Sequence, residues 1–270
     1  MTRPKEVISD FVTDGEELDR AVATLRPEQW ELPTPAPGWT IAHQVAHLTA
    51  TFNLAALAAS DPAAFTRLAN GLSDDFAKNV EDALAPYLAK PPDELLTHWR
   101  GSRSSAANAL LAAPPEEMLP WLVNPLPPAI LAAAGVMELF AHGQDIFDAL
   151  GVSPARTDRI RHLVAFSVRT WTFGYVARGL PVPDVAFRFE LVAPSGALWT
   201  YGPADGDQTI RGPAVDFCLL TTRRRHRADL ALRAVGADAD HWLDIAQAYR
   251  GPAGAGRRPG QFATTAAKHT

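Results

Sequence analysis

The hydrophobic periodicity of the chain changes near residue 180. Up to about residue 178, apolar residues recur at helical spacing, with almost no strand-like alternation. In "VAFRFELVAP", residues 185–194, Val, Phe, Phe and Leu alternate with the other side chains, which is typical of a half-buried strand. The next residues, "SG" and then "ALWTYG", predict a tight turn and a returning strand. The sequence therefore predicts a helical first part followed by a small part of mixed α and β structure.

Helices are predicted over six ranges: 5–27, 41–59, 74–89, 92–112, 128–150 and 155–178. Most prolines before residue 130 fall in the gaps between these ranges, where proline is tolerated. Thr40 is well placed as an N-cap and Gly151 as a C-cap residue. Further along, "QTIRG" predicts a strand, "PAVDFCLLTT" a helix running into a strand, and "DADHWLDIAQAYRG" a final amphipathic helix.

These patterns predict three segments. A helical bundle occupies 1–179, a small α+β domain 180–256 and a flexible tail 257–270, because the tail is rich in Gly, Pro and Ala and lacks a core pattern. The overall class is α+β.

Composition excludes several classes of protein. Of the 270 residues, 47% are hydrophobic and 20% are charged, which is typical of a soluble globular protein. The net charge of −5 gives no reason to expect nucleic acid or an acidic membrane as a partner. The sequence has neither the pattern of a secretory signal nor an apolar run long enough to span a membrane, so we expect a cytoplasmic protein.

Polar residues at helical spacing within apolar helices predict a metal site. Glu138, His142 and Asp145 project from one face of the helix expected over 128–150, and His43 and His47 lie one turn apart on the helix over 41–59. A Glu-x-x-x-His pair with a histidine from another helix is a common way to bind zinc inside a bundle, leaving one position open.

An exposed Glu–His pair without metal is the alternative. The apolar neighbours of Glu138 argue against exposure, because a carboxylate buried among them is costly unless it is paired or bound to a cation. We expect Asp145 to orient a ligand or cap a neighbouring group rather than to bind the metal. The sequence contains no Gly-rich phosphate loop, no H-E-x-x-H and no G-x-S-x-G.

The stretch "GWTIAHQVAHL", followed about ninety residues later by "ELFAHGQDI", resembles the DinB-like metal-binding bundle, and most closely its mycothiol-dependent maleylpyruvate isomerase branch. In that branch a four-helix bundle precedes a small α+β domain that resembles sterol carrier protein. "LWTYGPADGDQTIRGPAVDFCLL" is similar to that second domain, including its Gly-x-Ala-x-Asp element at 212–216.

The resemblance implies that His47, Glu138 and His142 are the metal ligands and that His43 supports them. It also implies that a basic residue of the second domain, Arg223 or Arg224, contacts the substrate. Composition alone favours the other interpretation of "RRRHR", residues 223–227, which is a solvated turn. The segment "HWLDIAQAYRGPAGAGR" departs from the usual isomerase pattern and is similar to a subgroup of uncharacterised metal-binding proteins, so maleylpyruvate itself need not be the substrate.

The resemblance predicts a zinc-dependent transferase or isomerase that uses mycothiol, or a related thiol, on an electrophilic small molecule. A bound divalent ion can hold a thiol as the nucleophilic thiolate. Two alternatives remain: a metal-containing binding protein without catalysis, and a hydrolase in which bound water is the nucleophile. We expect no nucleic-acid or membrane partner, and a monomer or homodimer.

Overall fold

The computed structural model describes residues 4–262. The chain forms two compact units, the first ending at Pro154 and the second beginning at Ala155. The first unit is helical and the second contains a four-stranded sheet, which confirms the predicted α+β class. No helix within residues 4–262 is long and apolar enough to cross a membrane.

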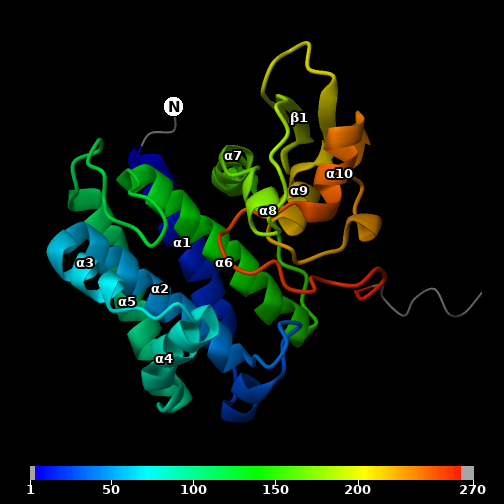
Figure 1. Ribbon diagram of the computed structural model, residues 1–270. Helices are drawn as coiled ribbons and strands as arrows, with labels where there is room; N and C mark the ends of the chain where they lie inside the picture. Colours follow the sequence, from blue (N-terminus) through cyan, green and yellow to red (C-terminus); the bar gives the residue numbers. More distant parts are fainter. Residues whose placement is uncertain (1–3, 263–270) are drawn as a thin grey trace, which may run out of the picture. The chain divides into compact units, whose positions relative to one another are not determined.

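Four long helices form the core of the first unit (Figure 1). They are α1 (Pro4–Val22), α2 (Ile41–Ser60), α5 (Pro92–Ala112) and α6 (Pro128–Leu150). Each packs against two others around the bundle, because α1 contacts α6 and α5, and α2 contacts the same two helices. The predicted four-helix bundle is confirmed, and the bounds of α5 and α6 are those predicted.

Local sequence fixes where α2 and α6 begin and end. Helix α2 begins after Thr40, the predicted N-cap, whose backbone is extended. Helix α6 begins with Pro128 and ends at Gly151, which adopts the left-handed conformation with φ 67°. Glycine adopts this conformation at little cost, and this explains why the helix stops there.

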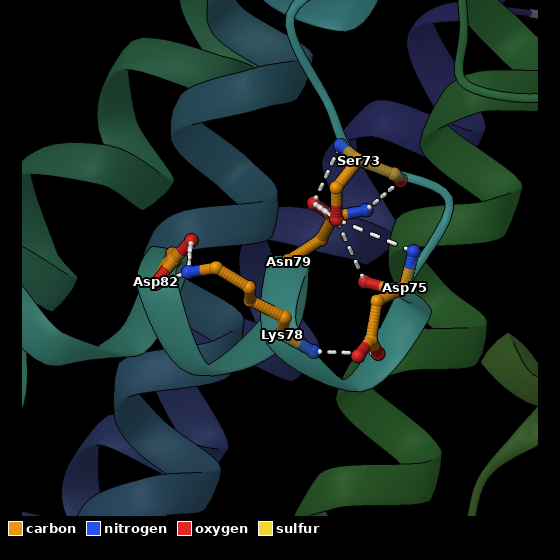
Figure 2. Close-up of polar contacts among 5 residues, drawn as sticks. All are labelled: Ser73, Asp75, Lys78, Asn79 and Asp82. Carbon is orange, nitrogen blue, oxygen red and sulfur yellow. Dashed lines mark hydrogen bonds and ion pairs between the residues drawn. The ribbon is translucent and has the colours of Figure 1, made fainter.

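Two shorter helices pack on α2. Helix α3 (Pro62–Asn70) was not predicted, and α4 (Phe76–Leu88) lies within the range expected for a helix at 74–89. Polar side chains hold the start of α4 (Figure 2): Asp75 accepts a hydrogen bond from the Lys78 amide at 3.1 Å, and Asn79 donates to the Ser73 carbonyl at 2.7 Å. The first bond satisfies a backbone amide that a helix start leaves unpaired, and the second ties the preceding loop to the helix.

The sheet of the second unit contains β1 (Phe187–Val192), β2 (Leu198–Tyr201), β3 (Gln208–Pro213) and β4 (Arg233–Val235), in the order β2-β1-β3-β4. Strands β1 and β2 form the predicted antiparallel hairpin, while β1 and β3 are parallel. Strand β4, which is antiparallel to β3, was not predicted.

Helices α9 (Ala214–Thr221) and α10 (Ala237–Ile245) pack against the sheet. The strand expected at the end of "PAVDFCLLTT" does not form, because the chain turns after α9 at Thr222, whose hydroxyl donates back to the Cys218 carbonyl.

The core of this unit is aromatic. Trp242 is fully buried, its ring stacks on Phe217 at a centroid distance of 5.9 Å, and its indole nitrogen donates to the Trp171 carbonyl at 2.9 Å.

The single helix expected over 155–178 is broken into η2 (Asp158–Ile160), α7 (Arg161–Arg169) and α8 (Phe173–Val176). At the break, the Thr170 hydroxyl donates to the Phe166 carbonyl and also lies 3.2 Å from the Ala248 carbonyl. Tertiary contacts therefore compete with the helix at this point.

These contacts also place the division between the units earlier than the expected boundary at 179/180. Helix α7 packs on α9, and Ser167 of α7 is hydrogen-bonded to Thr221 of α9 at 3.0 Å. The region from Ala155 onward therefore groups with the sheet. Part of the tail expected over 257–270 also contacts this unit, because the Gly260 amide donates to Asp229 at 2.8 Å. The rest of that tail, from residue 263, lies outside the described residues.

Candidate metal centre

Helices α2 and α6 bring His47, Glu138 and His142 together. One Glu138 carboxylate oxygen, Oε2, lies 3.4 Å from His47 Nε2 and 3.1 Å from His142 Nε2. The three donor atoms all lie within 4.8 Å of one another. The contact between α2 and α6 unites residues that are about ninety positions apart in the sequence.

The cluster fits a divalent ion such as zinc. Two donors that each lie about 2.1 Å from a tetrahedral ion are separated by roughly 3.4 Å, close to the 3.4 and 3.1 Å that separate Glu138 Oε2 from the nitrogens of His47 and His142. Two imidazole nitrogens and a carboxylate oxygen are ligands that zinc accepts, and three protein ligands leave one position for another molecule. The side chains of His47, Glu138 and His142 are 22%, 20% and 14% exposed, so the cluster is partly accessible to solvent.

The charge of Glu138 suits a metal ligand. Burial acts to raise the pKa of this carboxyl, but hydrogen bonds with His142 and His47 and the charge on their rings outweigh it. The net effect holds the pKa of Glu138 well below its usual range, so the side chain is a carboxylate.

Gln44 orients His142. The Gln44 amide oxygen lies 2.6 Å from His142 Nδ1, so Nδ1 donates this hydrogen bond and Nε2 faces Glu138, where it would offer its lone pair to a bound ion in place of the proton. The Gln44 amide group donates in turn to the Thr34 hydroxyl at 2.9 Å, and that hydroxyl donates to the Trp39 carbonyl at 2.9 Å. Gln44 is fully buried.

Trp39 covers one side of the cluster. Its ring centroid lies 5.4 Å from that of His47 and 5.9 Å from that of His142, with which it stacks. The loop before α2 holds it, because Pro33 and Thr40 form an isolated antiparallel bridge. Gly38, at φ 78°, provides the turn into this residue. Neither Gln44 nor Trp39 was predicted as a site residue; the position of Trp39 just before the N-cap of α2 was the available signal.

Two other predicted site residues of the first unit, His43 and Asp145, are not among the three donors. His43 Nδ1 lies 2.8 Å from the Thr40 hydroxyl and accepts from the Thr40 amide at 3.3 Å, so it helps to cap α2. Its ring lies 6.3 Å from that of Trp39. Asp145 is fully buried on α6, one turn beyond His142, and is not one of the three donors.

In the second unit, Arg223 and Arg224 follow α9. Arg223 adopts a left-handed backbone with φ 59° and donates to the Gly254 carbonyl at 3.2 Å, and burial lowers the pKa of its guanidinium. Arg224 is 9% exposed and donates to the Thr222 carbonyl at 2.6 Å. Arg227, by contrast, pairs with Asp240 and Asp244. Residues 223–227 therefore do not form a uniformly solvated turn.

Replacing Gln44 tests whether it supports the site. We expect Gln44→Leu to weaken zinc binding about 10–100-fold, because loss of the partner that orients a ligating histidine typically has this effect. The measurement is a competition titration with a chromophoric chelator. His43→Ala is the comparison, and we expect a smaller loss because His43 reaches the cluster only through its contact with Trp39. Equal zinc affinity of Gln44→Leu and the wild type would refute the role of Gln44.

Comparisons with known proteins agree with this architecture. Residues 13–147 match the family described as the mycothiol maleylpyruvate isomerase N-terminal domain. Uncharacterized proteins from two strains of Mycobacterium tuberculosis are each 42% identical over 257 residues, which cover 95% of this chain and 100% of the relative.

Two solved structures share the fold. A crystal structure of a mutant of the mycothiol-dependent maleylpyruvate isomerase superimposes with a TM-score of 0.57 at 13% identity, covering 86% of this chain and 93% of that one. A second structure of mycothiol-dependent maleylpyruvate isomerase gives a TM-score of 0.54 at 14% identity, covering 81% and 88%. At these identities the likeness concerns the fold.

Proposed function

The chain belongs to the family of the mycothiol maleylpyruvate isomerase N-terminal domain, and from this premise we propose that it is a metal-dependent enzyme that activates a low-molecular-weight thiol. The observation that carries the proposal is the cluster of His47, Glu138 and His142, which presents three donors that are partly accessible to solvent. Zinc is the ion that we propose, and mycothiol or a related thiol is the cosubstrate. The proposed location is the cytoplasm, where reducing conditions preserve a free thiol.

A divalent ion held by these residues would lower the pKa of a thiol in its open position, so that the thiol reacts as thiolate at neutral pH. The chain's own residues prepare that position. Glu138 supplies negative charge, Gln44 fixes the tautomer of His142, and the Trp39 ring shields two of the donors from water.

The proposed reaction begins with attack of the thiolate on an electrophilic carbon, such as one end of a conjugated double bond. Rotation about the resulting single bond, followed by elimination of the thiolate, returns a geometric isomer of the substrate and regenerates the thiol. If the carbanion formed by the addition instead takes up a proton from solvent, the product is a thioether, which is an S-transfer. Both outcomes use the same site.

Thiol dependence is the test of this proposal. The zinc-loaded protein is assayed against electrophilic alkenes and epoxides with and without mycothiol, and substrate loss and product geometry are followed by chromatography. We expect turnover only when thiol is present. Turnover at the same rate without thiol would indicate that water is the nucleophile, and a thiol-activating function would then be wrong.

We also propose that Arg223 or Arg224 binds an anionic group of the substrate, because guanidinium pairs well with carboxylate. We expect alanine at the responsible position to leave zinc content unchanged and to lower kcat/KM about 10–100-fold, the effect of losing a hydrogen bond to a charged group. Arg227→Ala is the control, since that side chain is occupied by Asp240 and Asp244. If both Arg223→Ala and Arg224→Ala keep the kcat/KM of the wild type, neither arginine takes part in the reaction.

A further inference from the structure

A groove lies in the first unit between α4 and the residues that lead into α2. Its volume is about 620 Å³, within the range of small-molecule sites. Trp39 and His43 line one side, and one face of α4 lines the other. The groove is separate from the three donor side chains but shares Trp39 with their surroundings.

Small side chains on α4 keep the groove open. Ala77, Ala85 and Ala89 lie on one face of the helix, spaced by eight and four residues, and all three line the groove. Leu84 is the buried residue of α4 and holds the helix against the unit. The start of α4 is fixed by the hydrogen bonds of Ser73, Asp75 and Asn79 (Figure 2), so this wall is held at its start as well as at Leu84.

The groove and the metal centre share an aromatic side chain. The Trp39 ring centroid lies 5.4 Å from that of His47 and 5.9 Å from that of His142. A molecule in the groove would therefore contact a residue that itself touches two of the three donors. The part of a ligand that lies in this groove and the part that reacts at the centre can belong to one molecule.

The charges of the groove select the kind of ligand. Its polar side chains are the Glu81 carboxylate and the His43 imidazole, and no Lys or Arg is among the described residues that line it. The nearby lysines Lys78 and Lys90 each pair with a carboxylate four residues later. A carboxylated ligand would find Glu81 repulsive and would lack a cationic partner. Hydroxyl groups can donate to Glu81 and accept from His43, because Thr40 occupies His43 Nδ1 and leaves the protonated Nε2 to donate.

We propose that this groove binds the neutral, hydroxylated carrier of the thiol cosubstrate, which in mycothiol is a glucosamine joined to inositol. The apolar face of a sugar ring packs on Trp39 and the alanines, and its hydroxyls bond to Glu81 and His43. The carboxylated or otherwise electrophilic substrate lies elsewhere. This assignment rests on the proposed function, since it names where the same cosubstrate is held.

The test compares two thiols that share a reactive end but differ in the carrier. Mycothiol and N-acetylcysteine methylamide, which lacks the sugars, are titrated into the full-length zinc-loaded protein by isothermal calorimetry. Ala85→Phe fills the groove from an exposed position of α4. We expect it to weaken mycothiol binding about tenfold or more, the effect of overfilling a packed site, while the affinity for the small thiol stays unchanged.

Matched variants separate the groove from the metal centre. Ala83→Phe places the same ring on an exposed position of α4 that does not line the groove, and it should change neither affinity. Glu81→Ala should weaken mycothiol binding alone, about tenfold for a lost hydrogen bond to a charged group. Its control is Asp74→Ala, at an exposed position that does not line the groove. The Glu81→Ala variant still tests the assignment if Ala85→Phe does not fold.

The possible outcomes separate a failure of the groove assignment from a failure of the proposed thiol-activating function. If the wild type binds both thiols, and Ala85→Phe and Glu81→Ala bind mycothiol as tightly as it does, the groove is not the carrier site although the thiol function stands. An equal loss of both thiols in these variants would overturn the assignment as well. If the wild type binds neither thiol, the proposed function itself is wrong and the assignment falls with it.

Discussion

Replacing Glu138 with alanine is expected to abolish stoichiometric zinc binding, from about one equivalent per chain to almost none, because three protein ligands are the minimum for an open zinc site. His47→Ala and His142→Ala should have the same effect. Glu138 Oε2 contacts both histidines, so its loss also removes the group that holds them together. The measurement is elemental analysis after dialysis, with circular dichroism to show that the helices remain.

Exposed residues of the same types are the controls for these variants. His98 and Glu94 lie on the exposed side of α5, and alanine at either position should leave the zinc content unchanged. A full equivalent of zinc in all three cluster variants would place the metal outside the cluster. Thiol-dependent turnover should disappear with the zinc.

Trp242→Ala is expected to have the largest effect on stability, lowering the free energy of unfolding by about 3–5 kcal/mol, the range for truncating a buried tryptophan. The side chain is fully buried among aromatic rings, and its indole nitrogen donates to the Trp171 carbonyl, which would lose its partner. Guanidinium denaturation followed by circular dichroism measures the change.

Trp199→Ala is the matched control, because Trp199 lies on the edge strand β2 and is only partly buried. We expect a loss well below that of Trp242→Ala. If the two variants unfold at the same denaturant concentration, Trp242 is not the centre of the aromatic core.

Local signals in the sequence were sufficient for the main helices of the first unit. Helix α6 begins and ends where Pro128 and Gly151 predict, and Thr40 marks the start of α2. Short elements were missed because their signals are weak. Helix α3 has a single buried residue, Phe65, and strand β4 has three residues. The break at Thr170 depends on a contact with Ala248, 78 residues away, which periodicity does not report.

The candidate site shows the same division between local and long-range information. The spacing of Glu138 and His142 on one helix placed both on a common face, as the structure shows. The approach of His47 depends on the packing of α2 against α6, and the family resemblance supplied it in advance. The bond between Gln44 and His142 joins residues 98 positions apart. No pattern in the sequence indicates that pair, although Gln44 lies among apolar residues of α2.

The central claim is that a metal held by His47, Glu138 and His142 is required to bind the thiol. Calorimetric titration of mycothiol into zinc-loaded wild type, metal-free wild type and Glu138→Ala tests it most directly. We predict one mycothiol per chain for the zinc-loaded protein, with no measurable binding to the other two. Binding of equal affinity in the metal-free protein or in Glu138→Ala would contradict the claim.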